Sequence, residues 1–246
     1  MTPPRFEELR DDLLRLREEN RGRATPEVAW LDAGGIGGPE ERLRWLLLRC
    51  ALDQGIGVRV LDRLCSRLLA RFGGALWELP APRQSALEAV LREDPALKGW
   101  LLERPFCGIV WSAARFARER APLVSYMRKD PDAVLGDAAR SIFWFGKSSD
   151  ERRKARRFVA LAAAPAPWGL GLRRAPAEWD GWTFPLWRGS LEFWSRRRAF
   201  WPFGGRLRRA DVARLLSDLA RRADPSAPEE IACAMRWCAP PEGAGC

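Results

Sequence analysis

The stretch ERLRWLLLRCALDQGIGVRVLDRLCSRLLARFG, residues 41–73, decides the fold class of this chain. Its apolar side chains recur every three or four positions, which is the spacing of amphipathic helices. Pro39 is a favourable first helical residue, and one side of the helix that it begins carries Leu43, Leu46, Leu47 and Cys50. A second helix is predicted over residues 58–72, after the glycines at 55 and 57.

The same spacing extends in both directions along the chain. It begins with Phe6, Leu9, Leu13 and Leu16, and it predicts further helices over residues 84–92, 95–102, 109–119, 131–145 and 150–163. The connections between them are short, which favours an all-α, orthogonal array of short helices over a bundle of long ones. GGIGG at residues 34–38 is a loop and not a phosphate cradle, because no strand precedes it and no GKS or GKT follows.

The composition changes after Ala164, where proline and glycine interrupt any long regular element. Residues 165–188 are expected to form an ordered loop pinned by aromatic rings, followed by helices over 190–198, 210–222 and 227–237. We therefore expect three segments that pack as one globular unit. They are an N-terminal helix and glycine-rich loop (1–38), a helical body with a hairpin-like segment (39–164), and a Trp/Arg-rich loop with closing helices (165–246).

The charge of the chain favours a polyanionic partner. It has 246 residues, 47% of them hydrophobic, a formal net charge of +10 and a pI near 10.1. Nearly all the basic residues are arginine, which suits phosphate contact, although the base composition of the source genome explains such a bias equally well. Histidine is absent, which excludes a Ser-His-Asp triad, a Cys-His pair and imidazole ligands for zinc.

The cysteines do not predict a metal site or a cofactor. Cys50 and Cys65 fall on apolar helical faces and are expected to be small buried hydrophobes. Cys233, Cys238 and Cys246 match neither a zinc ribbon nor a four-cysteine cluster loop. The N-terminus lacks an apolar signal region and no run is long enough to span a bilayer, so we expect a cytoplasmic protein without a membrane partner.

Tryptophan, arginine and proline are concentrated between Trp168 and Trp201. Rings beside guanidinium groups can stack on bases and contact phosphates, and we expect Trp182 and Trp187 to stack on a base. The candidate phosphate contacts of this segment are Arg188, Arg196 and Arg197. The alternative is structural: most tryptophans pack in cores, and many charged faces are simply solvated.

The order of segments resembles the helix-hairpin-helix DNA glycosylases, especially the archaeal-type N-glycosylase/DNA lyases that act on 8-oxoguanine. Residues 41–73 look like the first helices of that fold. SIFWFGKSSDERRKARRFVALAA, residues 141–163, looks like its hairpin and the helix that carries the catalytic lysine. The resemblance implies that Lys154 is the nucleophile, and the neighbouring candidates for nucleic-acid contact are Lys147, Ser148, Arg152 and Arg153.

This sequence departs from the family pattern where the catalytic aspartate is expected. FPLWRGSLEFW, residues 184–194, occupies the comparable place, but Trp187 is nearest the matched position, and the flanking carboxylates belong to Asp180 and Glu192. The LPGVG-type hairpin glycines are also missing, apart from Gly146. Either the carboxylate has moved or catalysis has been lost.

The chemistry of a glycosylase/lyase needs an amine to attack the sugar C1′ and a carboxylate to assist proton transfer. Lys154 lies in RRKARR, where neighbouring cations favour the free amine, although a solvated basic face or a phosphate contact explains it as well. Asp180 in EWDGW is a candidate carboxylate between rings, or simply part of an Asp-Gly turn.

Three functions remain open from the sequence. The first is a DNA-binding, base-excision N-glycosylase/DNA lyase that acts on a damaged base in double-stranded DNA through Lys154, with Asp180 or Glu192 as carboxylate. The second is a non-catalytic helical protein that binds nucleic acid through an Arg/Trp-rich surface. The third is an unrelated enzyme for a small anionic substrate, whose affinity for DNA would depend little on salt.

Overall fold

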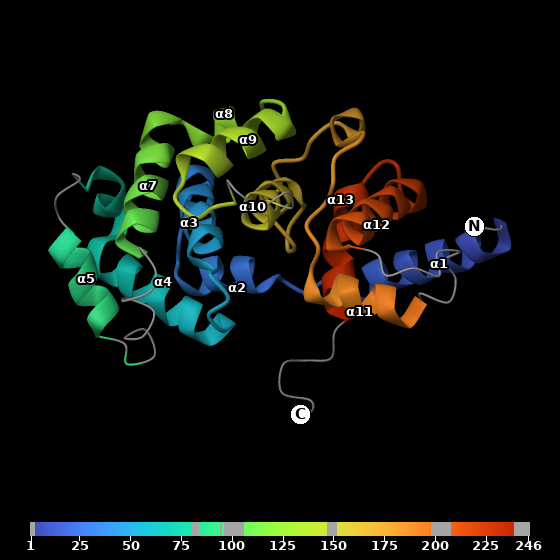
Figure 1. The fold of residues 1–246 in the computed structure, drawn as a ribbon, viewed down its shortest axis with the longest axis horizontal. Coiled ribbons are helices and arrows are strands. Elements are labelled where there is room, and N and C mark those ends of the chain that lie inside the picture. Colours follow the sequence, from blue (N-terminus) through green and yellow to red (C-terminus); the bar gives the residue numbers. More distant parts are fainter. Residues whose placement is uncertain are drawn as a thin grey trace. The chain divides into compact units, whose positions relative to one another are not determined.

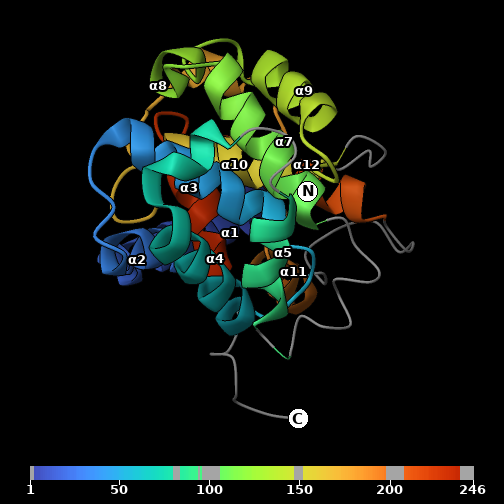
Figure 2. The ribbon, with the colours of Figure 1, turned by 90° about the vertical axis from the view of Figure 1, so that its left-hand side faces the viewer.

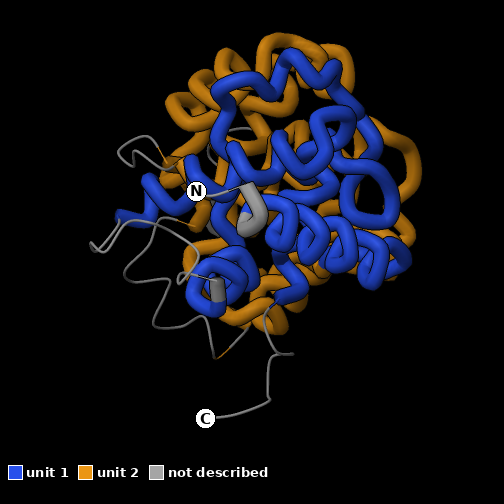
Figure 3. Tube along the Cα trace, turned by 90° about the vertical axis from the view of Figure 1, so that its right-hand side faces the viewer, with its two compact units in different colours: residues 1–25, 160–246 blue, residues 26–159 orange. Residues whose placement is uncertain are grey.

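The computed structural model describes residues 3–79, 84–93, 95, 106–146, 152–197 and 208–238. All regular structure in these ranges is helical and none of it is strand, which confirms the all-α prediction (Figure 1). The chain divides into two compact units (Figure 3). Unit 1 contains residues 1–25 and 160–246, and unit 2 contains residues 26–159. The divisions therefore fall at 25 and 159, and not at the expected 38 and 164.

Unit 2 contains most of the helices predicted in the body of the chain. Its elements are α2 (Pro26–Ala33), α3 (Pro39–Leu52), α4 (Val58–Phe72), η1 (Gly73–Glu78), α5 (Gln84–Arg92), α7 (Phe106–Glu119), α8 (Leu123–Tyr126), α9 (Pro131–Ser141) and the first part of α10 (Arg153–Ala163). The predicted helices over 58–72 and 84–92 are confirmed at both ends. The helix predicted over 95–102 lies outside the described residues, apart from Pro95.

Helix α3 is the centre of unit 2, and every residue from Trp45 to Leu52 is buried. It lies alongside α7 in two views and also contacts α2, α4 and α8 (Figures 1 and 2). The Trp45 ring packs between Trp30 and Trp77, with ring centroids 6.0 and 5.2 Å away. The Glu41 carboxylate accepts hydrogen bonds from Nε1 of Trp45 at 2.8 Å and of Trp77 at 2.9 Å. The core of this unit is therefore both apolar and fixed by directed hydrogen bonds.

Unit 1 joins the N-terminal helix to the C-terminal helices. Its elements are α1 (Pro3–Glu19), η3 (Pro176–Trp179), α11 (Arg188–Arg197), α12 (Arg209–Ala223), α13 (Pro228–Ala234), η5 (Met235–Cys238) and the last residues of α10. Helix α1 packs against α12 and α13, which is why the ends of the chain belong to one unit.

The loop after α10 is pinned by aromatic rings, as the tryptophan-rich composition predicts. Nε1 of Trp168 donates to the carbonyl oxygen of Asn20 at 2.9 Å, and the Trp168 carbonyl accepts from the Thr25 hydroxyl at 2.9 Å. The next residue, Gly169, has no room for a side chain, because a Cβ atom there would lie 2.2 Å from the carbonyl oxygen of Leu161. The loop therefore folds tightly onto the end of α10.

Candidate nucleic-acid interface

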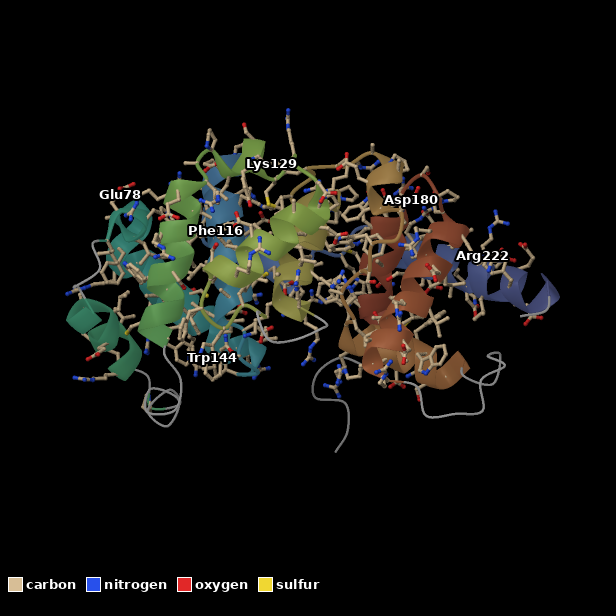
Figure 4. All side chains as sticks on the ribbon, turned by 45° about the horizontal axis from the view of Figure 1, so that its top comes forward. Glu78, Phe116, Lys129, Trp144, Asp180 and Arg222 are labelled. Atoms are coloured by element: carbon tan, nitrogen blue, oxygen red, sulfur yellow. The ribbon has the colours of Figure 1, made fainter. Side chains whose placement is uncertain are left out.

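The segment between α9 and α10 presents the two exposed large hydrophobic side chains of the described residues. Phe143 and Trp144 are each 49% exposed, and they stand between Ile142 and Phe145, which are 1% and 0% exposed. Trp144 is labelled in Figure 4. We call residues 142–146 the aromatic turn. The buried pair anchors it in unit 2 and leaves two adjacent rings in solvent.

The backbone of the aromatic turn is held in an unusual conformation. Trp144 has φ 57° and Gly146 has φ 115°, in the left-handed region that non-glycine residues rarely adopt. The amide of Phe143 donates to Oγ of Ser112 on α7 at 2.9 Å. The carbonyl oxygen of Trp144 accepts a hydrogen bond from Nζ of Lys154 at 2.7 Å. These hydrogen bonds to α7 and α10 thus stabilise a left-handed backbone conformation that has an unfavourable energy for a residue such as tryptophan.

Two arginines, Arg140 near the end of α9 and Arg152 directly before α10, approach Gly136 of α9. Nη1 of Arg140 lies 3.3 Å, and Nη1 of Arg152 3.7 Å, from the position that a Cβ atom would take at Gly136. Arg153 is exposed at the start of α10. Burial lowers the pKa of Arg156, and the charge of Arg152 lowers it further against an opposing effect of Asp132. Concentrated positive charge beside exposed rings is suited to a polyanion with flat bases.

A buried ion network holds α10 in unit 2. Glu27 of α2 is 1% exposed and Arg49 of α3 is 2% exposed. The Glu27 carboxylate lies 3.2 Å from Nη1 of Arg49 and 3.1 Å from Nη2 of Arg157 on α10. Arg157 also pairs with Asp53, and Arg49 with Asp62 at 2.7 Å. Burial by itself lowers the pKa of Arg157, but the two carboxylates outweigh it and raise that pKa.

The predicted nucleophile lies in unit 2, and the carboxylates predicted to assist it lie in unit 1. Lys154, Arg152 and Arg153 flank the aromatic turn, whereas Lys147 and Ser148 lie outside the described residues. Lys154 is partly exposed, and its Nζ donates to a backbone carbonyl.

The carboxylates of unit 1 occupy ordinary structural positions. Asp180 is exposed after η3 and precedes Gly181, which has φ 71°, so the pair forms a turn (Figure 4). Glu192 pairs with Arg196 one turn later on α11, with a distance of 2.9 Å. The placement of Asp180 matches the Asp-Gly turn that is the structural alternative for this residue.

The tryptophans predicted to stack on bases lie in the core of unit 1. Trp182 is 2% exposed, and its ring packs against Trp179 and Phe184 with centroid distances of 4.9 and 5.3 Å. Trp187 is 5% exposed, and the guanidinium of Arg236 lies 4.8 Å from its ring centroid. A base reaches neither ring in this arrangement, because their faces are already covered. Base stacking by these residues would require the core of unit 1 to open.

The predicted arginines of unit 1 lie on or near α11. Arg188 is exposed at the start of that helix, and Arg196 is exposed but paired with Glu192. The side chain of Arg197 lies outside what the structure describes. Phosphate contact by these residues stays a prediction.

Phe143 and Trp144 are candidate residues that the helical spacing of the sequence does not indicate. They belong to residues 141–163, but the predicted helix over 131–145 absorbed them, whereas α9 ends at Ser141. Ile142 already has extended backbone angles, φ −99° and ψ 129°. The signal that indicates their exposure is an FWF triplet directly before a glycine and a strongly basic helix.

Two cysteines of unit 2, Cys50 and Cys65, are buried and unreactive. Cys50 and Cys65 are 1% and 0% exposed, as predicted, and burial raises the pKa of each thiol to about 12. Both therefore remain protonated near neutral pH.

Within the described ranges, no helix has the length and apolar character needed to cross a membrane. No protein-family model, curated protein or solved structure matches this chain.

Proposed function

We propose that this protein binds nucleic acid, with duplex DNA the expected form, through the aromatic turn and the basic residues beside it. The observation that carries the proposal is the exposure of Phe143 and Trp144 in a turn whose Trp144 carbonyl accepts from Lys154, and whose Gly146 lies against the backbone of Arg152. Base–aromatic stacking contributes about 1–3 kcal/mol per base, and arginine contacts phosphate through two parallel hydrogen bonds. A turn that exposes two rings among cations combines both contributions.

The test is fluorescence anisotropy with labelled single- and double-stranded oligonucleotides. We expect Trp144→Ala to raise the Kd by about tenfold, since one stacking contact is lost. Trp111→Ala is the matched control, because Trp111 is a partly exposed ring on α7 of the same unit, beside Arg115. Equal affinity of the wild type and Trp144→Ala would exclude the aromatic turn as the binding surface.

A salt titration separates this proposal from an enzyme for a small anionic substrate. A nucleic-acid interface loses affinity steeply as salt rises, because bound counterions are released from the phosphates. A protein that recognises one small anion shows a shallow dependence on salt and on oligonucleotide length.

A base-excision N-glycosylase/DNA lyase is the second candidate. Lys154 favours it, because its Nζ lies 2.7 Å from the carbonyl oxygen of Trp144, beside the proposed stacking surface. In this mechanism the amine attacks C1′, the base leaves, and the resulting Schiff base is reducible. The nearby carboxylate that the reaction needs is not supplied by Asp180 or Glu192 within unit 2, since both belong to unit 1.

Borohydride trapping tests the second candidate directly. Duplexes containing 8-oxoguanine, uracil, hypoxanthine or an abasic site are incubated with protein and borohydride, then separated by denaturing electrophoresis. A covalent band that Lys154→Gln abolishes and Lys129→Gln preserves would establish a lysine lyase. Binding without any covalent band would leave the non-catalytic function.

A further inference from the structure

Two arginine side chains of unit 2 converge above Gly136, in the interior of α9. The Nη1 atoms of Arg140 and Arg152 lie 3.3 and 3.7 Å from the position that a Cβ atom would take at this glycine. Arg140 belongs to the last turn of α9, and Arg152 lies directly before α10. We call these two residues the arginine pair. They lie on either side of the aromatic turn in the sequence, and their guanidinium groups meet at one place.

Gly136 makes this approach possible. Its φ lies outside the left-handed region, so the backbone of α9 does not itself require glycine at this position. Glycine in the interior of a helix is also less favourable than alanine. The nearest atoms to the place of a side chain are guanidinium nitrogens of Arg140 and Arg152. The missing side chain therefore leaves room for two cations against the helix.

The described residues do not neutralise the arginine pair. Neither the Arg140 nor the Arg152 side chain forms an ion pair or a hydrogen bond with any residue that the structure describes. Asp137 is the carboxylate closest to Arg140 in the sequence, but it accepts hydrogen bonds from Arg120 and Tyr126 instead. Two like charges that converge in this way repel each other unless an anion lies between them.

The start of α10 adds further positive charge. Burial is the main cause that lowers the pKa of Arg156, the charge of Arg152 lowers it further, and Asp132 opposes both effects. The first turn of α10 contains no acidic residue, although the backbone dipole is positive at that end of a helix. Asp150 and Glu151 precede Arg152 in the sequence and lie outside the described residues. An anion would thus offset several unfavourable interactions at once.

We propose that Arg140 and Arg152 hold one phosphate group between them. A hydrogen bond from a guanidinium to a phosphate oxygen spans about 2.7–2.9 Å, so two oxygens of one phosphate can reach both Nη1 atoms. Arg140 is exposed and Arg152 is partly exposed, which leaves the pair accessible to a ligand.

The identity of this phosphate as part of a nucleic-acid backbone rests on the proposed function. Arg152 lies beside the aromatic turn, because a Cβ atom at Gly146 would be 3.0 Å from Cα of Arg152. A phosphate held by the arginine pair would therefore lie close to the turn that exposes Phe143 and Trp144. Such a contact positions the strand and does not read its sequence.

A shared phosphate predicts that the effects of the two arginines are not additive. Two arginines that contact different phosphates act independently, so their effects on the Kd multiply. When both contact one phosphate, loss of the first leaves the second in a less constrained geometry. Loss of the second then has a smaller effect.

The test measures binding of a labelled DNA duplex to Arg140→Gln, Arg152→Gln and the double variant by fluorescence anisotropy, in the full-length chain. We expect each single variant to raise the Kd about tenfold, since a charge-assisted contact is lost. The double variant should raise the Kd by clearly less than the product of the two single effects. Circular dichroism confirms that the variants are folded.

The matched control is Arg59→Gln/Arg71→Gln, which removes two positive charges from exposed positions on α4 of the same unit. We expect it to raise the Kd less than either single variant of the arginine pair. An equal effect of this control and of the double variant would overturn the inference, because net charge alone would then explain the binding.

Two further results would overturn the inference and leave the proposed function intact. A wild-type Kd in the double variant, together with weakened binding by Trp144→Ala, would exclude the arginine pair and leave the aromatic turn as the interface. Single effects that multiply in the double variant would assign Arg140 and Arg152 to separate phosphates.

Inorganic phosphate distinguishes failure of the inference from failure of the proposed function. Isothermal titration calorimetry at constant ionic strength measures its binding to the wild type and to the double variant. If the wild type binds no oligonucleotide but binds inorganic phosphate, and the double variant does not, the arginine pair is a site for a small phosphate ligand and the proposed function is wrong. Absence of binding to both probes would overturn both proposals.

Discussion

The side-chain amine of Lys154 donates to the backbone carbonyl of Trp144 at 2.7 Å, so the basic start of α10 is tied to one of the two exposed rings of the aromatic turn. This contact has a different meaning for each candidate function. For binding, it holds the aromatic turn in position before a ligand arrives, which reduces the ordering cost of association. For lyase chemistry, the amine must leave the carbonyl before it can attack C1′.

Replacement of Gly146 by alanine tests whether the turn conformation is required. Gly146 has φ 115°, and a Cβ atom there would lie 3.0 Å from Cα of Arg152. We expect Gly146→Ala to lower the free energy of unfolding by about 1–3 kcal/mol and to weaken oligonucleotide binding. The control is Gly57→Ala, because Gly57 has negative φ and open space around its Cα. Urea denaturation measures both variants, and equal stability would show that the turn accommodates a side chain.

The sequence predicts individual helices better than it predicts which residues are exposed in the connections between them. The helix over 58–72 was predicted at both ends because its periodicity agrees with the glycines that flank it. The helix predicted to end at 145 ends at Ser141, because the amide of Phe143 donates to the distant Oγ of Ser112. The local spacing of apolar residues does not predict that tertiary hydrogen bond.

The candidate site shows the same limit. Trp182 and Trp144 both lie in segments rich in aromatic and basic residues, yet one is 2% and the other 49% exposed. Composition identifies rings that can stack, but only packing shows which faces are open. The division into units also depends on contacts between residues far apart in the sequence, because α1 packs against helices at the other end of the chain. Local sequence patterns do not predict such contacts.

Removal of the shared carboxylate tests the buried ion network. Glu27→Gln leaves Arg49 and Arg157 buried without the charge that lies 3.2 and 3.1 Å from them. We expect a loss of about 1–3 kcal/mol in the free energy of unfolding, because each arginine loses one buried partner but keeps a second carboxylate, Asp62 or Asp53. Glu7→Gln is the control, since its pair with Arg10 is exposed and contributes about 0–1 kcal/mol. Similar denaturation midpoints for the two variants would contradict a stabilising network.

Acidification tests the junction between α7 and α9, where Asp137 accepts hydrogen bonds from Arg120 at 2.9 Å, Tyr126 at 2.6 Å and Ser141 at 3.1 Å. The hydrogen bond from Arg120 is the main cause that lowers the pKa of Asp137 to about 2, against the opposing effect of burial. Because this pKa is lowered on folding, the stabilisation is present above the unfolded value near 3.9 and is lost as pH falls toward 2. We expect it to amount to about 2 kcal/mol.

The variant Asp137→Asn isolates this contribution. Its free energy of unfolding should be lower than that of the wild type at pH 6, and the difference should shrink between pH 4 and pH 2. Urea titrations across that range measure it. A constant difference between the two proteins would exclude titration of Asp137 as the cause.

A close backbone contact in unit 1 gives the last prediction. Gly189 is the second residue of α11, which packs on η5, and a Cβ atom there would lie 2.1 Å from the carbonyl oxygen of Arg236 and 2.4 Å from that of Met235. Backbone atoms cannot rotate away as a side chain can, so Gly189→Ala must separate α11 from η5. We expect a loss of at least about 1–3 kcal/mol in the free energy of unfolding. Gly22→Ala is the control, because no atom lies within 4 Å of its added Cβ. If both variants unfold at the same urea concentration, α11 does not pack on η5 through this glycine.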